Sequence, residues 1–250
     1  MEIFIPLLIS SIAGLSTVLG SFIIFFKIKR VEEFITFCLS FSLSVMITLS
    51  VIDLIPNSSY IIFKNYGFIK GFIICFIFFI IGVLLVTVVN KKIDNKIKKS
   101  DSKNLFKLGI LSMFALMLHN FPEGIATFMS AYKDVSLGIS LGTAIMMHNI
   151  PEGISIAVPL FYSTGSKKRG VVYTFISGLA EPLGALLAYI FLKNYITDVM
   201  ISLVLILVAG IMITLAINEM YPEAERYKKS KYMYMGLIIG TFLMILNSLL

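Results

Sequence analysis

Charged residues are scarce in this chain of 250 residues. Asp, Glu, Lys and Arg together make up 14% of it, whereas 58% of the residues are hydrophobic. Soluble domains carry about a quarter charged residues, so this composition excludes an ordinary soluble domain. The apolar runs reach the roughly 20 residues that a helix needs to span a bilayer. The sequence therefore predicts an all-α polytopic membrane protein.

Eight apolar runs are long enough to form transmembrane helices. They cover, approximately, residues 3–26, 34–55, 69–90, 107–129, 136–161, 170–192, 199–220 and 232–250. A cleavable signal is not expected, because Glu2 replaces a basic start and the first run is long enough to span. We therefore expect residues 1–250 to form a single transmembrane domain.

Positive charge is unevenly distributed between the predicted loops. Of the 21 Lys and Arg residues, 17 fall in the four loops that follow the first, third, fifth and seventh runs. The positive-inside rule places these loops in the cytoplasm and both termini outside, which requires an even number of helices. The longest of them, residues 91–106, is Lys-rich, and we interpret it as a solvated linker that contacts anionic lipid headgroups. The net charge of +7 thus reflects membrane topology and not a nucleic-acid partner.

Thiols and nucleotide-binding motifs are also few or absent. Cys38 and Cys75 lie within predicted helices without CxxC spacing, which favours a packing role. No glycine-rich phosphate-binding motif occurs, so ATP-driven pumping is disfavoured.

Two pairs of segments repeat along the chain. SVMITLSVIDLIP (residues 44–56) matches GIMITLAINEMYP (210–222), and AGLSTVLG (13–20) matches SGLAEPLG (177–184). Chance similarity between apolar helices is the alternative, but the two matches share nearly the same offset. The paired helices would cross the membrane in opposite directions. We therefore predict an inverted repeat of helices 1–3 and 6–8 around an antiparallel pair of helices 4 and 5, a plan common in secondary transporters.

The predicted helices 4 and 5 carry a polar motif that occurs twice, as HNFPEG and HNIPEG. Its ligand-type residues are His119, Asn120, Glu123, His148, Asn149 and Glu152. In each copy His and Glu are four residues apart, so they project from one face of a helix. The prolines of the motif should kink both helices and leave carbonyl oxygens free.

Glu181, just before Pro182 in predicted helix 6, adds a carboxylate in one half of the repeat only. Buried carboxylates are unfavourable by roughly 2.5–3.5 kcal/mol each on insertion scales, and a divalent cation offsets that. Mixed nitrogen and oxygen ligands suit Zn²⁺, Fe²⁺, Mn²⁺ or Co²⁺, and the lack of thiolates argues against a tight structural zinc site. A single buried His is usually a hydrogen-bonded helix contact; two copies of the motif favour metal ligands. Met46 could bind a metal through its thioether, but packing is the stronger interpretation for this residue.

Asp53 and Glu219 occupy matching positions of the repeat, at the outer end of helix 2 and the inner end of helix 7. They could collect and release a cation at opposite ends of a path. Alternatively, they are interfacial residues at helices that end before Pro56 and Pro222.

These motifs, with GLAEPLGA and EMYPEA, resemble those of the ZIP (Zrt-, Irt-like) family of divalent-metal transporters, in its prokaryotic ZupT-like branch. The resemblance implies metal uptake into the cytoplasm across the cell membrane, commonly as a homodimer and with no cofactor. It also implies a two-metal centre. One site would use His119, Glu123, His148 and Glu152, with Met46 as a further ligand, and the other Asn120, Asn149 and Glu181, with Glu123 and Glu152 as bridges. The resemblance further implies that a bundle of helices 1, 4, 5 and 6 moves against the rest. The Lys-rich loop departs from the family because it lacks His.

Three functions compete. Transport of Zn²⁺, with Fe²⁺, Mn²⁺, Co²⁺ and Cd²⁺ as other substrates, fits the nearly symmetric site. An intramembrane metal-dependent hydrolase is the alternative, but neither motif copy is HExxH and no further His exists to complete a catalytic zinc site. A metal sensor is disfavoured because the chain has no soluble output domain.

Overall fold

The structure is a computed structural model that describes residues 3–27, 29–98 and 105–249. These residues form helices and short connections, and no strand occurs among them. The α-helices are α1 (Phe4–Ser21), α2 (Val31–Thr48), α3 (Ile55–Tyr66), α4 (Phe68–Lys98), α5 (Leu105–Lys133), α6 (Val135–Thr164), α7 (Lys167–Gly178), α8 (Ala180–Leu187), α9 (Asp198–Leu215), α10 (Tyr221–Arg226) and α11 (Ser230–Ser248). Short 3-10 segments cover Phe22–Phe25 and Lys193–Tyr195, and π-helical segments cover Leu49–Leu54, Ala188–Leu192 and Ala216–Met220.

The all-α polytopic class is confirmed. Six helical stretches of the described residues are long and apolar enough to cross a membrane: Phe4–Phe25, Val31–Tyr66, Phe68–Val88, Val135–Thr164, Lys167–Tyr195 and Asp198–Arg226. The count of eight spans stays a prediction. Side chains near the start of α5 lie outside the described ones, and Lys231 and Asn247 lower the apolarity of α11.

The predicted helix ends at residues 55 and 220 are wrong, because the chain stays helical past both prolines. A π-helical segment precedes Pro56 and another precedes Pro222, and the helices continue as α3 and α10. A proline lacks an N–H and clashes with the carbonyl four residues earlier. In a π turn each N–H pairs with the carbonyl five residues earlier, so a different carbonyl faces the proline ring and the helix need not end at Pro56 or Pro222.

The predicted loop at residues 91–106 is shorter in the structure. Helix α4 continues to Lys98 and α5 begins at Leu105, while residues 99–104 lie outside the described part of the chain. Lysine is a good helix former, so the helix does not have to end where the apolar run ends.

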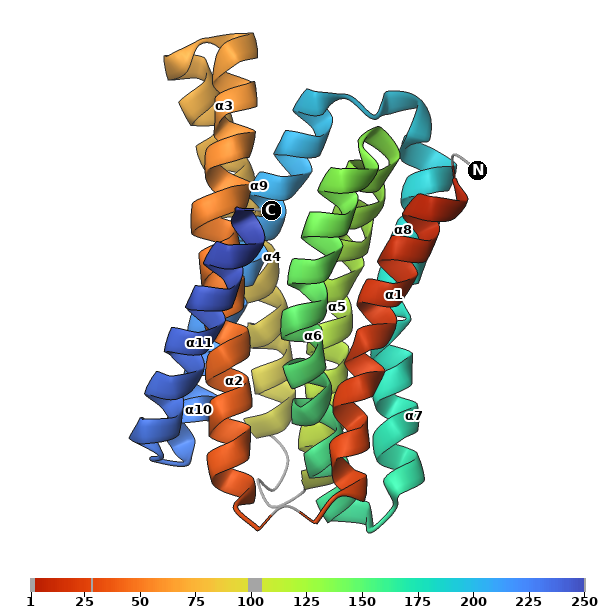
Figure 1. Ribbon diagram of the computed structural model, residues 1–250, viewed down its shortest axis with the longest axis vertical. Helices are drawn as coiled ribbons and strands as arrows, with labels where there is room; N and C mark the ends of the chain where they lie inside the picture. Colours follow the sequence, from red (N-terminus) through yellow and green to blue (C-terminus); the bar gives the residue numbers. More distant parts are fainter. Residues whose placement is uncertain (1–2, 28, 99–104, 250) are drawn as a thin grey trace.

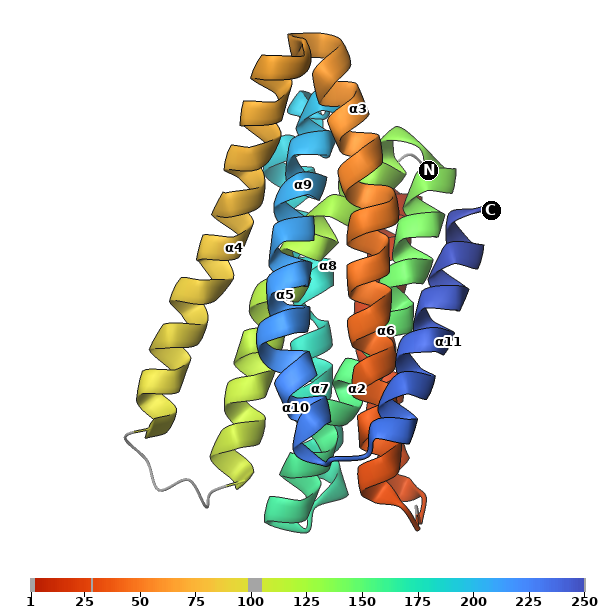
Figure 2. The ribbon, with the colours of Figure 1, turned by 90° about the vertical axis from the view of Figure 1, so that its left-hand side faces the viewer.

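The helices form two groups that face each other (Figures 1 and 2). Helices α1, α5, α6, α7 and α8 pack together, and we call them the motif bundle. Helices α2, α3, α4, α9, α10 and α11 form a flanking layer, in which α11 packs on α2 and α4 packs on α9. Contacts of α2 with α6 and of α5 with α9 join the two groups.

Close glycine contacts in the motif bundle follow the predicted two-fold relation. A Cβ on Gly14 would meet the carbonyl oxygen of Gly178, and a Cβ on Gly178 would meet that of Gly14. These two glycines are partners in the repeat, so the contact is reciprocal, as at a two-fold axis. The structure therefore supports the inverted repeat.

Two further glycine pairs behave in the same way. Gly124 of the first motif lies against the carbonyl of Glu181, and Gly153 of the second lies against that of Thr17, its repeat partner. Gly20 lies against the carbonyl of Ile150 in α6, while its partner Gly184 lies against the matching carbonyl in α5. Backbone-to-backbone contact without a Cβ allows these helices to approach closely.

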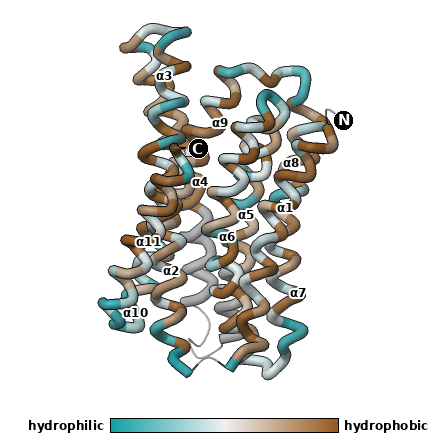
Figure 3. Tube along the Cα trace, in the orientation of Figure 1, coloured by the Kyte–Doolittle hydropathy of each residue, from teal (hydrophilic) through white to brown (hydrophobic). Residues whose placement is uncertain are grey.

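Hydrophilic residues gather at the two ends of the molecule, and apolar residues cover the helices between them (Figure 3). The exterior of α4 is strongly apolar: Phe72, Phe76 and Leu84 are each more than half exposed. Such a surface is expected where helices face lipid. The α1–α2 and α6–α7 connections, the α10–α11 turn and the facing ends of α4 and α5 all lie at one end (Figure 1). The described residues in and beside these connections include 15 of the 21 basic residues, so we call this end the basic end.

Candidate metal site

The two HNxPEG copies lie within α5 and α6, with Pro122 and Pro151 inside the helices. The helices are antiparallel neighbours in the motif bundle, so the two copies face each other. Their polar side chains are fully or almost fully buried: His119, Asn120, Glu123, His148, Asn149 and Glu152 expose between 0% and 2% of their surface. Glu181, in the first turn of α8, is equally buried.

Each histidine contacts the glutamate of the other copy. The Nε2 atom of His119 lies 3.2 Å from Glu152 Oε2, within hydrogen-bond distance. The corresponding distance from His148 Nε2 to Glu123 Oε2 is 3.5 Å. The two contacts are related by the two-fold axis, so each imidazole of one motif lies beside a carboxylate of the other, and we call the space that they enclose the site volume.

Asn149 links the site volume to α1 and α8. Its Nδ2 atom donates to the carbonyl oxygen of Ala13 at 3.0 Å and also to Glu181 Oε1. The side-chain nitrogen is thereby engaged, whereas Asn149 Oδ1 has no protein partner among the described residues. That oxygen is the atom with which Asn149 could bind a cation.

Most of the unpaired buried polar atoms of the described residues belong to this site. Eleven buried side-chain nitrogen or oxygen atoms lack a hydrogen-bond partner, and nine of them are on the seven residues named above. Both carboxylate oxygens of Glu123 and both amide atoms of Asn120 are included. Buried polar groups normally have partners, so such a concentration is typical of a ligand-binding site.

Hydroxyl groups bind several backbone carbonyls around the prolines. Pro151 cannot donate a backbone hydrogen bond, and the nearby carbonyl of His148 accepts one from Ser42 Oγ on α2 at 3.3 Å. The carbonyls of Glu123 and Glu152 accept hydroxyls from Thr127 and Ser155 of their own helices. The carbonyls that Pro122 and Pro151 leave without a backbone donor are instead those of Leu118 and Met147, so these hydroxyl bonds add to the helix and do not replace the missing ones.

The donor set fits a divalent transition metal. It combines two imidazoles, three carboxylates and two amides, and these nitrogen and oxygen ligands suit Zn²⁺ and similar ions. Among the described residues, no three His, Cys, Asp or Glu side chains are grouped closely enough to hold an ion as they stand. Each histidine instead lies against the glutamate of the opposite motif, with a hydrogen bond from His119 to Glu152 and a 3.5 Å approach of His148 to Glu123, so an ion would replace these contacts with ligand bonds.

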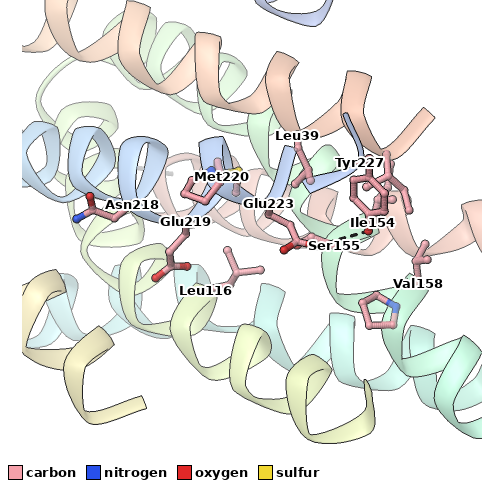
Figure 4. A pocket seen from close by; sticks show the side chains of 13 residues that line it. Leu39, Leu116, Ile154, Ser155, Val158, Asn218, Glu219, Met220, Glu223 and Tyr227 are labelled. Carbon is pink, nitrogen blue, oxygen red and sulfur yellow. Dashed lines mark hydrogen bonds between the residues drawn. The ribbon is translucent and has the colours of Figure 1, made fainter. Parts of the chain in front are cut away.

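A cavity of about 350 Å³ lies next to this site, between α2, α5, α6 and α10. Its polar lining includes Ser155, Asn218, Glu219, Glu223 and Tyr227 (Figure 4). Lining residues 154–159 of α6 follow the second motif and lead toward the basic end. The cavity therefore lies between the buried motif and the basic end.

Tyr227 forms part of the cavity wall next to Glu223. Its hydroxyl donates to Glu223 Oε1 at 3.5 Å, and Arg226 Nη1 lies at the same distance from this oxygen. Burial, and then the nearby Glu223 carboxylate, raise the pKa of Tyr227 above its usual value of about 10. The tyrosine thus stays protonated at neutral pH and can donate this bond.

Sequence comparisons agree with this architecture. A profile of the ZIP zinc transporter family matches residues 94–248. Proteins named zinc transporter ZupT from Clostridium perfringens and Streptococcus mutans are each 37% identical to the chain, cover all of it, and are themselves covered over 96% and 98%. The ZupT protein of Oceanobacillus iheyensis is 38% identical, with 97% of this chain and 96% of the relative covered. The chain belongs to the ZIP family.

The assignment confirms the family that the motifs indicate. The similarity to the two 37% identical relatives extends over the whole length of this ZIP chain. The relatives are named as transporters and not as enzymes. The hydrolase alternative therefore has no support from them.

Three other predicted residues of the ZIP chain lie outside the histidine–glutamate group. Met46 is fully buried on α2 and belongs to the main hydrophobic cluster. Asp53 lies in the π-helical segment Leu49–Leu54 and accepts a hydrogen bond from Asn57, and Glu219 lies in the π-helical segment Ala216–Met220 and lines the cavity. Met46 stays a prediction as a ligand, and so do Asp53 and Glu219 as pathway residues.

Several polar residues near the ZIP site were not predicted from the sequence. Glu223 and Tyr227 line the cavity, and Ser42 binds the His148 carbonyl. The spacing of four residues from Glu219 to Glu223 could have indicated a shared face. No local pattern identifies Ser42, because its role depends on how α2 packs against α6.

Proposed function

We propose that this ZIP protein moves Zn²⁺ across the cell membrane into the cytoplasm through the buried site on α5, α6 and α8. Support comes from the names of its relatives and from the chemistry of the donor set. Fe²⁺, Mn²⁺, Co²⁺ and Cd²⁺ are the competing substrates. The transported ion is the substrate, and no resident cofactor is proposed.

The nine unpaired polar atoms of the seven buried ligand-type residues are the observation on which this proposal rests. Glu123, Glu152 and Glu181 are all completely buried. Without a cation, three such carboxylates inside a membrane are unfavourable, by roughly 2.5–3.5 kcal/mol each on insertion scales. A divalent cation offsets this and binds the atoms that lack partners.

We further propose that two ions can bind at the site. One would use the imidazoles and carboxylates of His119, Glu123, His148 and Glu152. The other would use amide oxygens and Glu181, with Glu123 and Glu152 bridging both. The short distances between each histidine and the opposite glutamate support shared ligands.

The proposed path joins Asp53, the buried site and the cavity that Glu219 lines. The positive-inside rule supports a cytoplasmic basic end, and the cavity lies on that side of the motif. Both termini would then be extracytoplasmic. Ions would enter past Asp53 and leave past Glu219.

The test is zinc influx into proteoliposomes that contain a fluorescent chelator. The variant carries Glu123→Gln and Glu152→Gln, which keep the side-chain shapes but remove both bridging charges. Glu225→Gln is the matched control, because Glu225 is an exposed glutamate on α10. We expect saturable influx in the parent protein and the control, and at least a tenfold loss in the double variant.

Two results would contradict the proposal. Full influx in the double variant would exclude the buried glutamates as ligands. Zinc binding without any influx in the parent protein would instead favour the sensor or hydrolase alternative.

A further inference from the structure

The two halves of the motif bundle differ in the side chains that surround the asparagine of each motif copy. On one side of the two-fold axis, Asn149 donates to the carbonyl of Ala13 and to Glu181. The repeat partners of Ala13 and Glu181 are Ser177 and Thr17, and the matching motif residue is Asn120. The glycine contacts follow the same relation, since Gly124 meets Glu181 and Gly153 meets Thr17. The two-fold relation therefore places Asn120 on the side of Ser177, although the matching bond from Asn120 Nδ2 to the Ser177 carbonyl is not formed.

Asn120 and Ser177 are both completely buried, and neither has a hydrogen-bond partner within the described chain. Both amide atoms of Asn120 and the Oγ of Ser177 are unpaired. Thr17, which replaces a carboxylate here, is occupied because its hydroxyl donates to the Gly14 carbonyl at 2.7 Å. The free polar atoms on this side are thus those of Asn120, Ser177 and the neighbouring Glu123.

Ser177 is unlike most buried hydroxyl residues of the protein. Thr174, on the same helix, donates to the Gly170 carbonyl at 2.8 Å, and Ser202 of α9 donates to the Asp198 carbonyl at 2.7 Å. These bonds to the preceding turn are the usual solution for Ser and Thr inside helices. Ser177 Oγ makes no such bond, so its oxygen stays available to a ligand.

We propose that Ser177 Oγ, with the Asn120 amide oxygen and a Glu123 carboxylate oxygen, forms an all-oxygen binding position for the transported divalent cation. This inference rests on the proposed function and adds Ser177 to its ligands. Asn120 differs from Asn149 in that both of its amide atoms lack a partner, whereas the Asn149 nitrogen is held by Ala13 and Glu181 and only its oxygen is unpaired. An all-oxygen position suits harder cations such as Mn²⁺, whereas the histidine side suits Zn²⁺. The two positions would therefore differ in metal preference.

A thiol at position 177 tests this directly. Co²⁺ bound by a thiolate shows a charge-transfer absorption that oxygen and nitrogen ligands do not produce. We expect the Ser177→Cys protein, purified in detergent and titrated with Co²⁺, to show this absorption relative to the parent, which contains the same Cys38 and Cys75. Ser202→Cys is the matched control, because Ser202 is an equally buried serine on another helix, and it should give no new absorption.

A second variant measures the contribution of the hydroxyl. Ser177→Ala breaks no hydrogen bond of the described structure, so a change in metal affinity reports on the ligand role. We expect Mn²⁺ binding to weaken about three- to tenfold, the range for loss of one polar contact, and more than Zn²⁺ binding does. Ser202→Ala should bind both ions like the parent protein.

The outcomes separate this inference from the proposed function. If the parent protein binds Co²⁺ and transports Zn²⁺, but Ser177→Cys lacks the absorption and Ser177→Ala binds Mn²⁺ as tightly as the control, Ser177 is not a ligand. Such a result would include the case in which only water binds there. If the parent protein neither binds nor transports these metals, the proposed function fails first and this inference fails with it.

Discussion

Histidine occurs only twice in the chain, and both copies lie at the same buried site. His119 and His148 each contact a glutamate of the opposite motif, at 3.2 and 3.5 Å. Removal of both imidazoles leaves the two glutamates without these contacts and the site with oxygen ligands only. These two nitrogens are therefore expected to determine the preference for Zn²⁺ over harder ions.

We predict that His119→Ala with His148→Ala lowers Zn²⁺ affinity at least tenfold and affects Mn²⁺ affinity less. The physical reason is that Zn²⁺ favours imidazole nitrogen, whereas Mn²⁺ favours oxygen. Isothermal titration of the detergent-purified protein measures both affinities. Asn247→Ala, which changes a buried polar residue on α11, is the control. An equal loss for the two ions would remove the imidazoles as the source of selectivity.

A second prediction concerns a glycine of the motif. A Cβ on Gly153 would collide with the backbone carbonyl of Thr17, whereas a Cβ on Gly142 of the same helix would meet mainly the flexible side chain of Ile9. Overpacking against backbone is unfavourable by about 1–3 kcal/mol. We expect Gly153→Ala to lower the unfolding temperature in detergent clearly and Gly142→Ala to change it little or raise it. Equal melting temperatures would contradict close packing of α1 on α6.

Helix boundaries show which elements the sequence can predict. Long apolar runs identify the helices, because length and hydropathy are local properties. The ends near Pro56 and Pro222 were predicted wrongly, because the rule for prolines assumes α-helical hydrogen bonding and each proline follows a π-helical segment. Both π-helical segments fall at matched positions of the repeat, so even this deviation follows the internal symmetry.

The site was predictable to the extent that it is duplicated. The two HNxPEG copies and Glu181 lie together as spacing and repeat suggest. The pairing of each histidine with the opposite glutamate was not predicted, since it depends on how α5 and α6 cross. Ser177 and Ser42 were also missed. A single hydroxyl in an apolar helix has no local signal, and its importance becomes visible only through its neighbours.

The next prediction concerns the π-helical segments Leu49–Leu54 and Ala216–Met220. Asp53 belongs to one and Glu219 to the other, and only Glu219 lines the cavity near the basic end. We expect Asp53→Asn to raise the Zn²⁺ concentration for half-maximal influx, and Glu219→Gln to lower the maximal rate with a smaller effect on that concentration. Initial rates of chelator fluorescence against zinc concentration separate the two effects. Identical changes in both variants would contradict their assignment to opposite ends.

At the scale of the whole molecule, the distribution of basic residues predicts its orientation. Among the described residues, 15 of the 21 Lys and Arg lie in and beside the connections at one end, and the α5–α6 and α8–α9 connections lie at the other (Figure 1). We predict that a cysteine at Asn194 reacts with a membrane-impermeant maleimide added to intact cells, whereas one at Ser166 reacts only after lysis. Cys38 and Cys75 are buried and should remain unlabelled in the parent protein. Labelling of Ser166→Cys in intact cells would invert the proposed topology.

The homodimer implied by family resemblance stays a prediction at this scale. Much of the exterior of α4 is apolar, and lipid or a second copy would cover such a surface equally well. Cross-linking in native membranes, compared with light scattering in detergent, measures the oligomeric state. A monomer in both would contradict the prediction.

The concentration of positive charge beyond the cavity affects how fast an ion can leave. On the proposed path, a divalent cation that passes Glu219 toward the basic end would move against the repulsion of many lysines and arginines, which screening limits to about 10 Å at 0.1 M salt and about 3 Å at 1 M. The opposite end, with only four basic residues, presents a much smaller barrier. Flux should therefore rise with ionic strength on the basic side and respond little to salt on the other, so that the protein behaves as a rectifier whose asymmetry dissolved salt can reduce.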